Sequence, residues 1–278
     1  MYQPIFARRP CARLVRLALA SGLSLSAAAQ SSDPVLEEIT VVARSQYYGN
    51  NVVSDSMKMQ QSPMTSVNAL IDNLPGVSIQ EGDAYGFDDW STTIAVRGFQ
   101  NNLDEQQIGT TLDGIPNGGS SYGGGAKANR YLDTANLRTV NVSQGTADIA
   151  SRALDALGGT IDFVSDDPEE EARIRFQGSA GEYDAERYYV RVDTGRLANG
   201  TRAWFSASHQ SASDWVNGAA ENERDHLAAK MISEIGSTDV TAYISYDDTH
   251  EDNYQRLFGP DEFRSNPEWD RLTDIWTG

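Results

Sequence analysis

Cysteine is almost absent from this sequence, which has a single one, Cys11, in 278 residues. A disulfide or a thiolate metal site needs at least two cysteines, so both are excluded. Histidine is nearly as rare, with His209, His226 and His250 as the complete set. We therefore predict no metal site and no cofactor from the residue types alone.

Positive charge is also scarce. The chain has 22 Lys and Arg against 40 Asp and Glu, which gives a formal net charge of −18. Proteins that bind nucleic acid neutralise phosphates with clustered Lys and Arg. The composition therefore argues against a nucleic-acid partner.

Long hydrophobic runs are missing. The apolar segment 17–25 is well short of the roughly 20 residues that a membrane-spanning helix needs. Basic residues precede it, among them Arg8, Arg9 and Arg13, and Ala27 to Ala29 follow it. This order is typical of a cleaved secretory signal peptide, which we place at residues 1–29.

Enzyme motifs are equally hard to find. Residues 119–123 match G-x-S-x-G by letter, but that motif needs a buried strand before the serine and a helix after it. Here the flanks are Asn117-Gly118 and Gly124-Gly125. No phosphate-binding glycine loop and no HExxH motif occurs, so we do not expect an enzyme.

The first feature after the predicted signal peptide is a β-prone segment attached to a polar linker. In residues 30–61, the segment Glu38, Ile39, Thr40, Val41 and Val42 is followed by a polar linker. A segment of this kind can add a strand to the sheet edge of a partner through its main chain. The alternative is that it forms the first strand of the following domain.

Residues 62–167 predict a small α+β domain. Ser62-Pro63 is a helix start, and Val67, Leu70, Ile71 and Leu74 share one helical face before Pro75-Gly76 ends it. Short strands are predicted at 77–79, 92–96, 107–112, 137–142 and 159–164, and one or two helical turns at 149–157.

In residues 168–278, apolar and polar residues alternate with a period of two. Five segments alternate in this way, at 173–181, 187–193, 201–209, 225–233 and 240–246. Basic residues alternate with the apolar set, namely Arg175, Arg187, Arg191, Arg202 and Lys230. A soluble sandwich would turn these outward to water, whereas a membrane barrel would turn them to a wet lumen. The alternation fits both.

Several motifs in order resemble the TonB-dependent outer-membrane receptors. The segment 37–43 looks like a TonB box, and 68–79, 94–99, 112–116 and 156–164 resemble successive parts of the plug domain. One stretch departs from the family, which usually has Arg-Gly-Pro where this chain has Gln144-Gly145-Thr146. That departure puts any contact of the usual arginine in doubt.

The resemblance implies an α+β plug domain followed by antiparallel β-strands of an incomplete transmembrane β-barrel. The family's barrel has about 22 strands, and five strands would leave two edges without partners in lipid. We therefore expect a truncated receptor, with the TonB box and linker at 30–61, the plug at 62–167 and the first barrel strands at 168–278.

By the same resemblance, the parent protein resides in the outer membrane and takes up a scarce nutrient, such as a ferric siderophore, cobalamin, haem or a saccharide. TonB would bind Glu38 to Val42, and outer-membrane lipid would surround the strands. A loop with Tyr85, Phe87, Asp88, Asp89 and Trp90 would contact the nutrient, unless its aromatics pack on the barrel wall. The alternative function is a secreted or periplasmic β-rich binding protein. The sequence does not identify the substrate or the oligomeric state.

Overall fold

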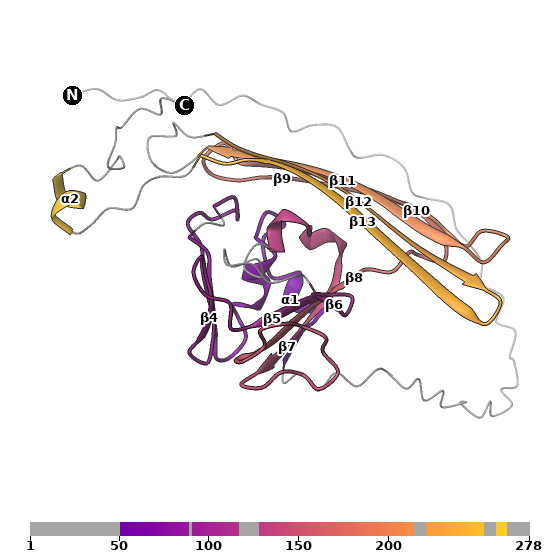
Figure 1. The fold of residues 1–278 in the computed structure, drawn as a ribbon. Coiled ribbons are helices and arrows are strands. Elements are labelled where there is room, and N and C mark those ends of the chain that lie inside the picture. Colours follow the sequence, from indigo (N-terminus) through magenta and orange to yellow (C-terminus); the bar gives the residue numbers. More distant parts are fainter. Residues whose placement is uncertain (1–50, 89–90, 117–127, 214–220, 253–259, 266–278) are drawn as a thin grey trace, which may run out of the picture. The chain divides into compact units, whose positions relative to one another are not determined.

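The computed structural model describes residues 51–88, 91–116, 128–213, 221–252 and 260–265. The predicted signal peptide and the segment Glu38 to Val42 lie outside these residues, as do Asp89 and Trp90. We treat the described chain as an N-terminal domain, residues 51–167, and a C-terminal sheet made of five long strands (Figure 1).

The N-terminal domain is built on two small sheets. The first has the order β1-β7-β8-β5-β6, in which only the β5–β8 pair is parallel, and the second has the order β2-β3-β4. The strands are β1 (Asn51–Val53), β2 (Val77–Gln80), β3 (Thr93–Val96), β4 (Phe99–Asn101), β5 (Gly109–Leu112), β6 (Ile115–Pro116), β7 (Leu137–Gln144) and β8 (Gly159–Ser165). The helical elements are α1 (Asp55–Lys58) and the 3₁₀ turns η1 (Asn68–Ile71) and η3 (Thr134–Asn136).

Two tight hairpins follow from local sequence. Arg97-Gly98 joins β3 to β4, and Asp113-Gly114 joins β5 to β6, with positive φ at all four residues. Two-residue loops of this conformation match the twist of the flanking strands, and glycine adopts it without a Cβ clash. The Asp113 carboxylate, held at the turn, accepts hydrogen bonds from the backbone N–H and the hydroxyl of Ser165.

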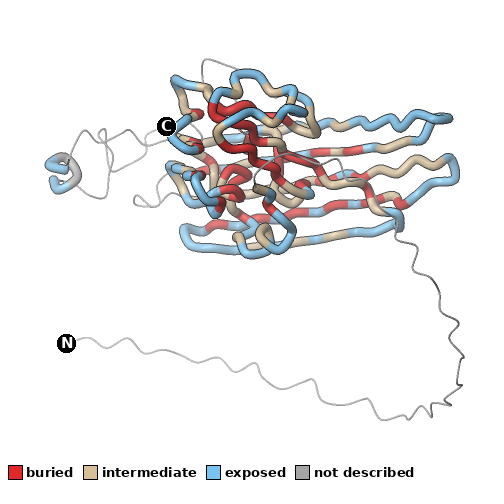
Figure 2. The backbone as a smooth tube through the Cα atoms, turned by 90° about the horizontal axis from the view of Figure 1, so that it is seen from below, coloured by how far each residue is buried: buried red, intermediate tan, exposed pale blue. Residues whose placement is uncertain are grey.

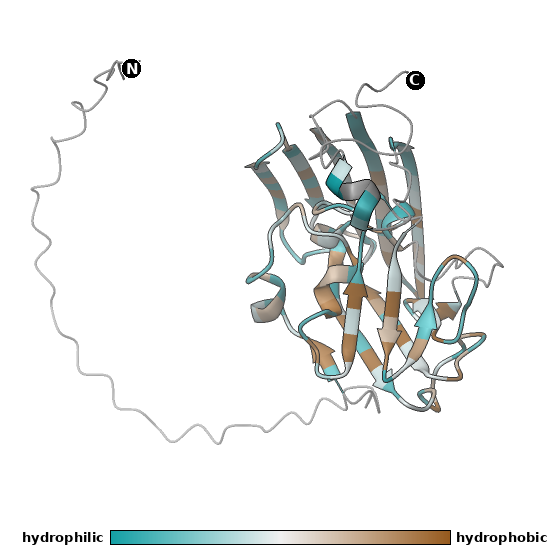
Figure 3. Cartoon of the chain, turned by 90° about the vertical axis from the view of Figure 1, so that its left-hand side faces the viewer, coloured by the Kyte–Doolittle hydropathy of each residue, from teal (hydrophilic) through white to brown (hydrophobic). Residues whose placement is uncertain are grey.

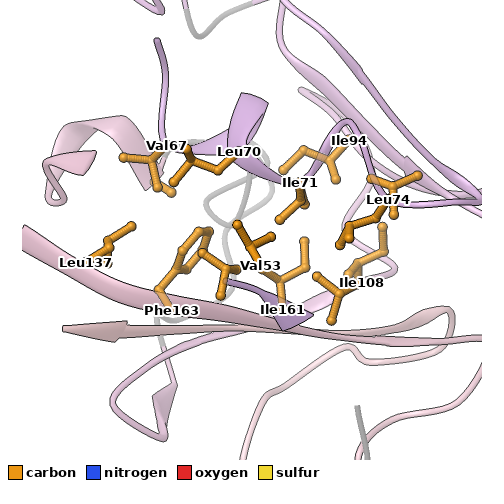
Figure 4. Close-up of a cluster of buried hydrophobic side chains, with 14 of the residues drawn as sticks. Val53, Val67, Leu70, Ile71, Leu74, Ile94, Ile108, Leu137, Ile161 and Phe163 are labelled. Carbon is orange, nitrogen blue, oxygen red and sulfur yellow. The ribbon is translucent and has the colours of Figure 1, made fainter. Parts of the chain in front are cut away.

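The domain has a continuous hydrophobic core. Val67, Leu70 and Ile71 from the η1 region face Ile161 and Phe163 of β8 (Figure 4). Val140 and Val142 on β7, and Ile161 and Phe163 on β8, are each two residues apart, which places both members of a pair on the same face of the sheet. In Figure 3, hydrophobic residues gather in the strands of this domain.

The structure corrects the predicted helix at 62–74, where only the short η1 is helical. Side chains take two of the N–H groups that a longer helix would use, because the N–H of Val67 bonds Asn129 and that of Ala69 bonds the hydroxyl of Ser66. The bond from Ser66 is local and illustrates why polar residues disfavour helix interiors, whereas Asn129 lies 62 residues away.

The helical turns predicted at 149–157 are also absent. The side chains of Asp148 and Ser151 accept the N–H groups of Ala150 and Ala153, which produces turns. The domain also begins before residue 62, since β1 pairs with β7 through Asn51↔Val142 to Val53↔Val140. Part of the predicted linker therefore belongs to the sheet.

The C-terminal sheet confirms all five alternating segments as antiparallel strands, in the order β13-β12-β11-β10-β9. They are β9 (Ala172–Ala180), β10 (Glu186–Thr194), β11 (Arg202–Ser213), β12 (Glu221–Ile235) and β13 (Thr238–His250), and a short helix, α2 (Pro260–Ser265), follows. In the part of the chain that is described, no helix combines the length and the apolar character needed to cross a membrane.

The two faces of this sheet differ in an unusual way. Burial alternates along the strands (Figure 2), and the buried positions include Arg187, Arg191 and Lys230. The other face exposes large apolar side chains, namely Ile174, Phe176, Tyr188, Val190, Val192, Phe205, Leu227, Met231, Val240, Ile244 and Tyr246. A soluble sandwich would bury this apolar set instead. The arrangement is that of a barrel wall, with a polar inner face and an apolar outer face.

Candidate functional site: the contact between the N-terminal domain and the strands

Asp133 is the centre of a buried polar contact between the N-terminal domain and the strands. Its carboxylate receives two hydrogen bonds from the Arg187 guanidinium on β10, at 2.7 and 2.9 Å. It also accepts the hydroxyl of Ser208 on β11 at 2.6 Å and the N–H of Ala135, which caps η3. The side chains of Asp133 and Arg187 are only 5% and 3% exposed. One carboxylate therefore joins the N-terminal domain to two strands.

Electrostatics keep this carboxylate ionised. Burial alone would raise the pKa of Asp133, but the positive charge of Arg187, with smaller contributions from His226 and Arg224, lowers it below its ordinary range. Both bonds come from the same guanidinium nitrogen, Nη2, and charge-assisted bonds of this kind are stronger than those between neutral groups. Arg224 adds a hydrogen bond to the Leu132 carbonyl oxygen at 2.8 Å, next to Asp133 in the chain.

A second contact surrounds Arg191 on β10. Its guanidinium is fully buried and bonds Asp193 on its own strand and Asp166 at the end of the N-terminal domain, each at 2.7 Å. It also lies 4.8 Å from the ring centre of Trp204, whose indole N–H donates to the Asp166 carbonyl oxygen. Stacking on tryptophan suits the planar guanidinium and would be lost with lysine.

Lys230 on β12 makes the third contact. Its ammonium, 4% exposed, donates to the hydroxyl of Ser165 at 2.9 Å and to Asp167 at 2.8 Å. Asp167 is half-buried, and although burial raises its pKa, the bond from Lys230 lowers it overall. All three contacts thus pair an acid of the N-terminal domain with a base on the strands.

The predicted ligand loop is used for packing in the part that is described. Phe87 is 4% exposed and lies in a cluster with Met64, Ala185 and Ala212, which joins the loop to the turn before β10 and to β11. The hydroxyl of Tyr85 donates to the Glu182 carbonyl oxygen at 2.9 Å. The prediction that Phe87 is free to stack on a ligand is therefore corrected, because the strands cover its ring.

The acids of this loop mostly hold the loop itself together. Asp83 accepts the N–H groups of Tyr85 and Asp88, and Asp88 accepts the N–H and the hydroxyl of Ser91. Burial raises the pKa of Glu81 to about 7, against a hydrogen bond from Ser66 that lowers it. Of the five predicted ligand residues, Asp89 and Trp90 lie outside the described residues, and Tyr85 and Asp88 are partly buried.

Sequence reasoning missed the acids that matter most here. It placed Arg175, Arg187, Arg191, Arg202 and Lys230 on one face but named no partner for them. The sequence did contain a signal for them, which is its excess of acidic over basic residues: a base that becomes buried needs a buried acid as its partner. Gln144, where the chain departs from its family, links Arg97 to the Pro75 carbonyl oxygen, at 3.0 and 2.8 Å. An arginine at that position would face Arg97.

The chain was compared with known proteins. Residues 45–160 match the TonB-dependent Receptor Plug Domain family, whose members are proteins of the outer membrane. A comparison with curated sequences gave no significant match.

Solved structures with a similar fold include several receptors. The pyoverdine receptor FpvA of Pseudomonas aeruginosa PAO1 is 20% identical over 69% of this chain and 26% of its own, with a TM-score of 0.53. The siderophore receptor PiuA of Acinetobacter baumannii is 18% identical over 72% of this chain and 26% of its own, with a TM-score of 0.55. The ferric-catecholate import receptor Fiu of E. coli K12 is 19% identical over 73% of this chain and 27% of its own, also at 0.55. The chain thus spans about a quarter of the length of these receptors.

Proposed function

Because this chain carries the plug domain and the first barrel strands of a TonB-dependent receptor, we propose that it is part of an outer-membrane receptor for a scarce nutrient. The N-terminal domain is the plug, and β9 to β13 are the strands of the wall. The proposal includes export to the outer membrane after cleavage of the signal peptide at residues 1–29.

One observation carries the proposal. The strands bury their bases against acids of the plug and leave their apolar side chains exposed, as in the pairs Arg187–Asp133 and Lys230–Asp167. An apolar outer face suits a surrounding of lipid, and polar contacts inside suit a plug that is held but can rearrange, because hydrogen bonds to water can replace those that break.

We assign nutrient binding to the class of ferric siderophores. The support is that FpvA was solved bound to pyoverdine, that PiuA is described as a siderophore receptor and that Fiu imports ferric catecholates. Of the predicted loop, Trp90 and Asp89 remain the proposed contacts, with Tyr85 and Asp88 beside them.

We assign TonB binding to Glu38, Ile39, Thr40, Val41 and Val42. β-branched residues favour an extended backbone, and a strand added to a partner sheet binds through main-chain N–H and C=O groups. This segment lies only eight residues before β1, so tension on it would act directly on an edge strand of the plug.

The test of the TonB assignment compares two substitutions at one position. Thr40→Pro removes an N–H donor, whereas Thr40→Val keeps the donor and the β-branched shape. We expect the proline variant to lose capture by the purified periplasmic domain of TonB and the valine variant to retain it. Equal capture of both variants would refute the assignment.

A further inference from the structure

The outward face of the sheet carries a cluster of metal-ligating side chains at one end. His209 on β11 lies directly opposite Asp225 on β12, and Glu223 follows two residues away on the same face. These positions continue the alternation of Phe205 on β11 and Leu227 on β12, both of which are exposed. The cluster therefore points away from the plug and takes no part in the contacts described above.

The distances within the cluster are close to those of a metal site. Nδ1 of His209 lies 2.8 Å from Asp225 Oδ1 and 3.6 Å from Glu223 Oε1, and all three atoms lie within 4.8 Å of one another. Zinc–ligand bonds of about 2.0–2.2 Å place neighbouring ligands roughly 2.9 to 3.4 Å apart, in octahedral and tetrahedral geometry respectively. Small movements of exposed side chains would bring the three atoms into that range.

The side chains around the cluster carry an excess of negative charge, which a bound cation would neutralise. Asp248 on β13 lies opposite Asp225, and like charges in directly opposed positions destabilise a sheet. Each Lys and Arg on the described residues of β10 to β13 lies on the other, plug-facing side: Arg187, Arg191, Arg202, Arg224 and Lys230. No Lys or Arg of these strands therefore neutralises the carboxylates of Glu223, Asp225 and Asp248. Besides His209, the basic side chain on this face is His250, which lies opposite Glu223 and pairs with Asp252.

A groove gives access to the cluster. It has a volume of about 490 Å³, and His209, Asp225 and Asp248 form its polar end, while Phe176, Leu227 and Tyr246 line the rest. A cation held by the first two residues would thus have Asp248 beside it and open positions for water.

We propose that His209, Glu223 and Asp225 bind a divalent transition-metal cation of the zinc class. An imidazole ligand favours zinc over magnesium or calcium, which prefer oxygen ligands alone. Binding replaces the hydrogen bond between His209 Nδ1 and Asp225: the neutral imidazole binds the cation through Nδ1 and carries its proton on Nε2. The cation ties β11 to β12 at their shared end. This site is independent of nutrient uptake and of TonB.

The experiment titrates the full chain, without an affinity tag, with Zn²⁺ in detergent against a chromophoric chelator. We expect one tight equivalent for the unmodified chain and at least a tenfold loss of affinity in Asp225→Asn and Glu223→Gln, which keep the side-chain shape. His209→Ala should abolish the tight site, and a large excess of Mg²⁺ should not displace the zinc.

Asp239→Asn is the matched control for the carboxylate variants, because Asp239 is also exposed but lies at the other end of β13, opposite Glu234. It should bind zinc like the unmodified chain. The absence of a tight equivalent, or equal affinity in the unmodified chain and His209→Ala, would overturn the proposal. The proposal would also fail if Asp239→Asn lost as much affinity as Asp225→Asn.

Discussion

The negative charge of Asp133 should contribute a large part of the free energy that holds the plug against the strands. The variant Asp133→Asn removes this charge while changing little else. Asparagine keeps nearly the same shape and can still cap η3, but the Arg187 guanidinium then remains buried without a counter-charge. Its other side-chain contacts are a long hydrogen bond to Gln177 at 3.3 Å and the ring of Tyr189, whose centre is 5.3 Å away. Removing one partner of a buried ion pair typically costs about 3–5 kcal/mol. We expect a loss of about 3 kcal/mol, since Ser208 and the cap remain.

The assay is denaturant unfolding of the full chain in detergent, followed by protease resistance of the plug. A double-mutant cycle with Arg187→Met separates the pair from the individual residues, because the double variant no longer buries an unpaired charge. We expect the double variant to lose less free energy of unfolding than the two single variants together. Asp155→Asn, at an exposed position, is the matched control and should change stability by less than about 0.5 kcal/mol.

The same pair predicts an acid dependence with a definite sign. The pKa of Asp133 is lower in the folded chain than its ordinary value of 3.8. Its contribution is therefore complete above that value and is lost as the pH falls below it. Asp133→Asn should remove this part of the acid destabilisation. A variant that unfolds at the same denaturant concentration as the unmodified chain, with a coupling energy below about 0.5 kcal/mol, would refute the reasoning.

Two further predictions concern the loop before β3. Phe87→Ala should reduce the free energy of unfolding by about 3 kcal/mol, since it opens a cavity in a buried cluster. Tyr85→Phe should reduce it by less than about 1 kcal/mol, because only one partly exposed hydrogen bond is lost. Equal losses for the two variants in the same unfolding assay would contradict the packing described. The raised pKa of Glu81, about 7 against 4.5, means that the unmodified chain loses stability as the pH rises from 4.5 to 7. Glu81→Gln should therefore be more stable than the unmodified chain at pH 8, by up to about 3 kcal/mol, and no more stable at pH 4; a difference that is independent of pH would exclude this explanation.

The strands were predictable because their signal is local. Alternation with period two identified all five long strands, and the short apolar run at 159–164 identified β8. The hairpins at Arg97-Gly98 and Asp113-Gly114 are also local, since a two-residue loop with glycine in second place favours that turn.

The predictions that failed depend on partners far away in the sequence. Residues 62–74 have a helical pattern, but Asn129, 62 residues after Val67, takes one of the N–H groups that a helix would need. Phe87 has the composition of a ligand contact, and only the position of Ala185 and Ala212 shows that its ring is covered. Asp133 and Arg187 are 54 residues apart, and no local pattern relates them.

The basic residues of the strands show how structure resolves what alternation leaves open. Arg187, Arg191 and Lys230 alternate with apolar residues, and the same pattern would serve a sandwich with its bases in water. A buried charge is tolerated only when it is paired, so the location of the acids shows which face of the sheet is buried. Those acids are Asp133, Asp166 and Asp167, and all of them belong to the plug. The acids of the N-terminal domain thus determine which face of the sheet is buried, and the apolar side chains are left on the exposed face as a consequence.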